Sequence, residues 1–115
     1  GVGGSVGASA TNDFLFVRGA ALAPSAPLVF ELIGDAVARP AFPEREVELL
    51  RTQSLSALRL ELSQPAALAG RAFRQGLYGD HPYGRSATPE TVRGITRDDL
   101  VTFQRTRLRP RGALL

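Results

Sequence analysis

The amino-acid sequence predicts an α+β fold with two N-terminal strands followed by four to five helices. Two observations lead to this prediction. Residues 5–22 hold two short segments of strand-like composition around a polar turn. From residue 25 onward, apolar residues recur at helical spacing in segments separated by prolines and glycines. Because the strands are few and both ends look like cut edges, we expect the 115 residues to be an incomplete part of one domain, 1–115.

The first strand is expected at Ser5–Ala10 and the second at Phe14–Leu22, with Thr11–Asp13 as the turn between them. The first strand has the sequence SVGASA, so most of its side chains are small. A strand of this composition lets another backbone approach closely.

Five helices are expected after the strands, and each begins with a candidate N-cap residue or with a proline in its first turn. The segment Thr96-x-x-Asp99 resembles a capping box for the last helix. The expected ranges are about 25–38, 43–63, 65–78, 88–94 and 97–108, after which the terminal GALL looks like the beginning of a strand. From the helical phasing we expect one buried cluster that includes Leu32, Ile33, Leu58 and Phe73.

The composition excludes several kinds of chemistry. The chain has no cysteine, which excludes disulfides, thiolate catalysis and cysteine zinc sites. No apolar run reaches membrane length, so we expect no membrane partner, and the small, flexible start lacks the features of a signal peptide. The compartment is left open, with the cytoplasm favoured.

All 14 basic residues are arginines, which raises the pI to 10.5 although the net charge is only +3. Four of them occupy every second position near the C-terminus, with no acidic residue among them: Arg105, Arg107, Arg109 and Arg111. They indicate either a nucleic-acid or phosphate site, or a helix C-terminus where the dipole favours cations. No aromatic residues interleave with them, so the helix end is the preferred interpretation and nucleic acid is disfavoured as a partner.

Four stretches, in this order, resemble the insulinase-like metallopeptidases, a superfamily that includes pitrilysin and the mitochondrial processing peptidases. They are GGSVGASATND, LIGDAVARPAF, LYGDHPYGR and ITRDDLVTFQRTRLRPRGALL, and the resemblance runs through nearly the whole chain. It implies a two-layer domain with a mostly antiparallel sheet covered on one face by helices. It also implies a second insulinase-like domain or subunit, in a homo- or heterodimer that encloses a chamber for peptides.

In active members of this family, an H-x-x-E-H motif and a downstream glutamate hold a zinc ion. The only histidine here is His81, in the expected loop HPYGRSATPE, so this chain cannot form that zinc site alone; the motif would lie upstream of Gly1. The position of the glutamate ligand falls at or beside Ala57, with Glu48 and Glu61 as the nearest acids, and an alignment shift of four residues would bring in Glu61. The resemblance therefore implies no metal ligand and no catalytic residue in this chain, and zinc in a partner domain or subunit. We interpret His81 as a structural loop residue, since no second cluster of ligand-type residues lies near it.

In the family, the strand after the Gly-Gly pair receives the peptide substrate by strand addition. The matching residues form the candidate peptide-binding edge: Gly4, Ser5, Val6, Gly7, Ala8, Ser9 and Ala10. Active relatives often carry asparagine where this chain has Gly7, which weakens a catalytic interpretation. The alternative is an ordinary edge strand, or one paired inside the sheet.

The sequence leaves three hypotheses for the function. The first is a non-catalytic insulinase-like domain or subunit that forms part of a peptide-binding chamber next to a zinc-bearing partner. The second is a fragment of an active zinc metalloendopeptidase whose H-x-x-E-H motif lies outside this chain. The third is a small arginine-rich domain that binds nucleic acid. The residues before Gly1 would separate the first two, and a steep salt dependence of nucleic-acid binding would support the third.

Overall fold

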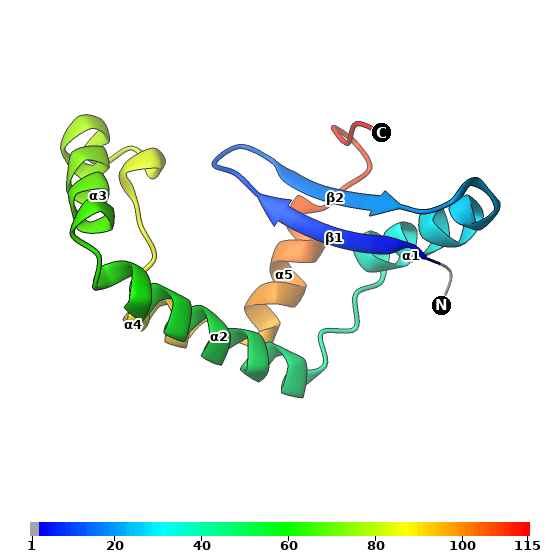
Figure 1. Ribbon diagram of the computed structural model, residues 1–115, viewed down its shortest axis with the longest axis horizontal. Coiled ribbons are helices and arrows are strands. Elements are labelled where there is room, and N and C mark those ends of the chain that lie inside the picture. Colours follow the sequence, from blue (N-terminus) through cyan, green and yellow to red (C-terminus); the bar gives the residue numbers. More distant parts are fainter. Residues whose placement is uncertain (1–2) are drawn as a thin grey trace. The chain divides into compact units, whose positions relative to one another are not determined.

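Two antiparallel strands and five helices make up the part of the chain that the computed structural model describes, residues 3–115 (Figure 1). This confirms the small α+β arrangement expected from the sequence. Gly1 and Val2 of the expected domain lie outside the described residues. Internal contacts divide the chain into two compact units: one runs to Ala41 and resumes at Val101, and the other is Phe42–Leu100.

The first unit begins with a hairpin of β1 (Ser5–Ala10) and β2 (Leu15–Ala20). The strands pair in register from Ser5 opposite Ala20 to Ala10 opposite Leu15. Thr11 closes the turn: its N–H donates to the carbonyl of Phe14 at 2.8 Å, and its hydroxyl accepts from the N–H of Phe14 at 3.1 Å. The second strand is shorter than expected at both ends, because Phe14 closes the turn with Thr11 and a 3₁₀ turn, η1 (Ala23–Ser25), follows the strand closely.

Helix α1 (Ala26–Ala38) packs on the hairpin through Val29, which is only 8% exposed. Strand β2 has glycine at position 19, where a Cβ would come within 2.9 Å of Ile33 Cδ1 on α1. The absence of a side chain at Gly19 therefore lets the helix lie close to the strand. The side-chain amide of Gln104 donates a hydrogen bond to the carbonyl of Val37, near the C-terminal end of α1, at 3.1 Å.

The second unit holds α2 (Glu44–Leu62), α3 (Pro65–Tyr78), the short 3₁₀ turn η2 (Pro82–Gly84) and α4 (Pro89–Gly94). In Figure 1, α4 lies alongside α2, and α3 leaves α2 in a new direction after the break before Pro65. The best-buried large side chain of this unit is Leu58 on α2, at 6% exposure. Helix α5 (Arg97–Arg107) begins in this unit.

The helix ends follow the signals in the sequence. Thr88 caps α4: its hydroxyl accepts from the N–H of Thr91 at 3.2 Å, and the Thr91 hydroxyl accepts from the N–H of Thr88 at 2.9 Å. Ahead of α5, the N–H of Thr96 donates to Asp99 Oδ2 at 2.7 Å, while the N–H of Asp99 donates to the Thr96 hydroxyl at 3.2 Å. Helix α3 ends at Gly79, whose φ of 53° favours glycine.

Two expectations about the fold were wrong. Leu32 is 48% exposed and Phe73 is 69% exposed, so neither belongs to a buried cluster with Ile33 and Leu58. Helical phasing finds residues that share a face, but it does not say whether anything in the chain covers that face. The terminal GALL forms no strand either; a turn at Arg111 and Gly112 precedes irregular backbone.

Candidate functional site

The candidate peptide-binding edge consists of β1 and Gly4 before it. Every residue from Ser5 to Ala10 is exposed. Among the described residues the sheet has only the two strands β1 and β2, so the outer edge of β1 has no neighbouring strand. An unpaired edge presents backbone N–H and C=O groups that an added strand can bond. The structure thus places an open strand edge at these residues, while peptide binding there stays a prediction.

The two faces of the hairpin differ. Helix α1 covers the face of Gly4 and Gly19, since a Cβ built at either position would meet the side chain of Val29. Side chains alternate along a strand, so the next residue on each side points to the opposite face. That open face carries Ser5, Gly7, Ser9, Phe16, Arg18 and Ala20.

An open hollow of about 430 Å³ lies along β1 and β2. Its lining residues come from both strands: Ser5, Gly7, Ala8, Ser9, Arg18, Gly19 and Ala20. A Cβ built on Gly7 would have no atom within 4 Å, so the space above the middle of β1 is unobstructed. The open face of β1 is therefore accessible to a ligand at Gly7.

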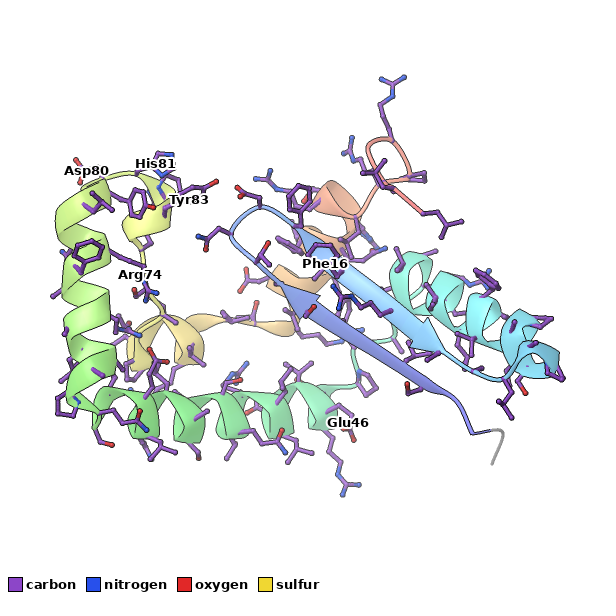
Figure 2. All side chains as sticks on the ribbon, turned by 45° about the horizontal axis from the view of Figure 1, so that its top comes forward. Phe16, Glu46, Arg74, Asp80, His81 and Tyr83 are labelled. Carbon is purple, nitrogen blue, oxygen red and sulfur yellow. The ribbon has the colours of Figure 1, made fainter. Side chains whose placement is uncertain are left out.

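Arg18 is the one charged side chain that lines this hollow. Its guanidinium carbon lies 5.2 Å from the ring centroid of Phe16, which Figure 2 shows on β2. In the register of the hairpin, Arg18 stands directly opposite Gly7. Within residues 3–115, no carboxylate forms an ion pair with Arg18.

His81 lies in the turn after α3, where it contacts neighbouring residues. Its Nδ1 accepts a hydrogen bond from the N–H of Tyr83 at 3.2 Å, which caps η2. The rings of His81 and Tyr83 meet edge to face at 4.6 Å, and Tyr83 meets Tyr78 in the same way at 5.6 Å. Figure 2 shows Asp80, His81 and Tyr83 together beyond the end of α3. The local contacts of His81 are those of a loop residue, as interpreted from the sequence.

The candidate positions of the zinc-ligating glutamate lie on α2. Ala57 is exposed and offers no ligand atom. Glu48 forms an ion pair with Arg51. Glu61 Oε1 accepts from a guanidinium nitrogen of Arg71 at 3.1 Å. In the described part of the chain, no three His, Asp or Glu side chains are grouped so that they could hold a metal ion.

Arg71 links three segments of the second unit, a role that no pattern in the sequence predicted. Besides Glu61 on α2, it donates to the carbonyl of Ala87 in the segment before α4. Only 16% of its side chain is exposed. Glu61 therefore helps to hold α2 and α3 together.

A second hollow, also not foreseen, lies within the second unit. This apolar groove has a volume of about 400 Å³ and is lined by Phe42, Pro43, Glu46, Val47, Leu50, Arg51, Ser54, Val92, Ile95 and Leu100. Val47 and Leu50 on α2 line one wall of the groove. The guanidinium of Arg51 donates to the carbonyl of Ile95 and so joins the two sides of the groove.

The four C-terminal arginines follow the helix-end interpretation. Arg105 and Arg107 lie in the last turn of α5, where the helix dipole favours cations, and Arg109 and Arg111 follow in the irregular segment. None of the helices formed by residues 3–115 has the length and hydropathy of a membrane span.

No family model matches this chain. A protein from Mycobacterium leprae, described as an uncharacterized zinc protease, is 30% identical to it over 111 residues, which are 95% of this chain and 25% of that protein. Proteins with the same description from Mycobacterium bovis and Mycobacterium tuberculosis are 27% identical over 111 residues, again 95% of this chain and 25% of theirs. The chain thus spans about a quarter of the length of the curated relatives it matches. The similarity supports a metallopeptidase-like chain and is distributed over nearly all of it.

Proposed function

We propose that this chain is a non-catalytic insulinase-like domain that forms part of a peptide-binding chamber beside a zinc-bearing partner domain or subunit. The observation that carries the proposal is the outer edge of β1, which pairs with no strand among the described residues. A peptide in extended form can bond its backbone to this edge, because the small side chains of SVGASA leave room for it. The similarity to proteins described as zinc proteases supports a role in peptide handling.

The residues of the chain support the absence of a zinc site of its own. One histidine is too few for the two imidazole ligands of the family's site. The resemblance puts the position of the glutamate ligand at or beside Ala57, which offers no ligand atom, and Glu61, one helical turn away, accepts a hydrogen bond from Arg71. Zinc would therefore be held by the partner, and this chain would hold peptide.

The second candidate function is a portion of an active zinc endopeptidase. It is favoured by one observation: Glu61 lies one helical turn from Ala57 on α2, so a shift in alignment would place a carboxylate at the ligand position. In that case a protein that carries an H-x-x-E-H motif before Gly1 would bind one zinc ion and lose it on substitution Glu61→Gln. Under the proposal, the same substitution leaves the zinc content of the assembly unchanged.

Binding by strand addition can be tested with N-methylated peptides on the 115-residue chain. Three versions of one neutral eight-residue peptide are compared: unmodified, methylated at alternate amides, and methylated at every amide. Alternate methylation leaves one edge of the peptide able to form backbone hydrogen bonds, so the unmodified and the alternately methylated peptides should both bind weakly. The fully methylated peptide donates no backbone hydrogen bond and should not bind. Equal binding of the fully methylated peptide, followed by amide chemical shifts, would show that strand addition is not the mode of recognition.

A further inference from the structure

Arg18 and Gly7 are partners across the hairpin, on the face that α1 leaves open. Gly7 contributes no side chain, and the space above it is empty to 4 Å. The flanking residues of β1 on this face, Ser5 and Ser9, have short side chains. The Arg18 guanidinium can therefore extend across β1 toward its outer edge without meeting a bulky group.

The distances suit a contact with a peptide on that edge. Neighbouring strands lie about 4.8 Å apart, so a strand added to β1 would lie about 10 Å from β2. Arg18 has a long side chain, and so does a glutamate on the added strand. Together the two side chains can span this distance, because Gly7 between them has no side chain. The present contact of Arg18 with Phe16 is an exposed cation–π interaction, which is weak enough to be exchanged for an ion pair.

The net charge of the unit that contains the hairpin favours an acidic ligand. The unit that contains β1, β2 and α1 has six arginines and three acidic residues, so it carries the whole net charge of the chain. In the described chain, Arg18 has no carboxylate partner. Arg39, by comparison, pairs with Asp35 on α1. A guanidinium without an ion-pair partner at an open strand edge is complementary to a carboxylate on the incoming strand.

We infer that Arg18 gives the β1 edge a preference for extended peptides that carry an acidic side chain opposite Gly7. The inference rests on the proposed function, since it requires a peptide on β1. It adds the class of peptide that this edge selects. Arg18 acts as a specificity determinant, while the backbone of β1 supplies the binding common to all peptides.

The test is a double-mutant cycle on the 115-residue chain. Two eight-residue peptides that differ only in a central Glu or Gln are titrated into the wild-type chain and into Arg18→Gln. The wild-type chain should bind the Glu peptide about two- to fivefold more tightly than the Gln peptide at low salt, the range of an exposed ion pair. The Arg18→Gln variant should bind both peptides equally. Its affinity for either peptide should equal that of the wild-type chain for the Gln peptide.

A control variant, Arg39→Gln, removes the same charge from the residue that follows α1 and should keep the preference for Glu. A second variant, Gly7→Thr, fills the gap that Arg18 crosses and should reduce the preference without abolishing binding. If both peptides bind the wild-type chain equally, the role of Arg18 is wrong and strand addition stands. If neither peptide binds, strand addition fails as well, and both proposals are overturned.

Discussion

Gly19 of β2 lies directly against Val29 of α1, with no room for a side chain between them. A Cβ at position 19 would overlap the Val29 side chain, and the Ile33 side chain stands on the same side. This contact holds the helix on the hairpin and leaves the opposite face of β1 and β2 open for a ligand.

The first prediction follows from that contact. Gly19→Ala should destabilise the chain by about 1–3 kcal/mol, because the added methyl group overpacks the interface between β2 and α1. Gly7→Ala is the matched control: it adds the same methyl group to the same hairpin in open space, and should leave stability nearly unchanged. Urea unfolding measures both. A Gly19→Ala chain as stable as Gly7→Ala would show that α1 does not lie on this face.

The second prediction concerns the interior of the other unit. Leu58→Ala should cost about 2–5 kcal/mol, because Leu58 is 6% exposed and its removal leaves a cavity. Phe73→Ala, at a side chain that is 69% exposed, should change the stability by no more than about 0.5 kcal/mol. The two variants are compared by thermal and chemical unfolding. The reverse order of the two effects would mean that the helices of this unit are phased differently.

The third prediction is a pH dependence at the start of α5. The backbone N–H and the hydroxyl of Thr96 both donate to Asp99 and hold the pKa of its carboxyl below its usual value. Because the pKa of Asp99 is lower in the folded chain than in the unfolded chain, its ionised carboxylate stabilises the fold. This stabilisation is fully present above the unfolded pKa of about 3.8 and is lost as the pH falls through the folded pKa. Wild-type and Asp99→Asn chains should therefore differ in stability at neutral pH and converge in acid. A difference that persists at pH 2 would rule out the carboxylate as its source.

The fourth prediction concerns zinc. The 115-residue chain should bind no zinc tightly and should cleave no peptide, since it has one imidazole and carboxylates alone make poor tight zinc sites. Metal analysis after dialysis against zinc, with a peptidase assay alongside, is the measurement. Stoichiometric zinc that is lost in His81→Ala would overturn this view of the chain.

Features encoded by neighbouring residues could be predicted from the sequence. The strand at Ser5–Ala10 and the capping box of Thr96 and Asp99 depend on local composition and on hydrogen bonds over three residues. The start of α4 after Thr88 is of the same kind. Such signals act within one turn, so one sequence is enough to find them.

Features that depend on which surfaces meet could not be predicted. The periodicity of α3 places Phe73 on the apolar face of the helix, but it does not show that this face is exposed. The bridge from Arg71 to Glu61 joins residues ten apart on different helices, and an arginine carries no sign of its partner. Likewise, nothing local in FVRGA indicates that Gly19 faces a helix while Arg18 faces an open hollow.

Amide hydrogen exchange along β1 tests the central claim most directly. In the free 115-residue chain, the amides of Ser5–Ala10 that bond β2 should be protected, while the alternate amides, which point to the open edge, should exchange rapidly. A saturating extended peptide should protect those alternate amides and leave the amides of α3 unchanged. Protection of all β1 amides in the free chain, or no gain in protection with peptide, would contradict the assignment of β1 as a peptide-binding edge.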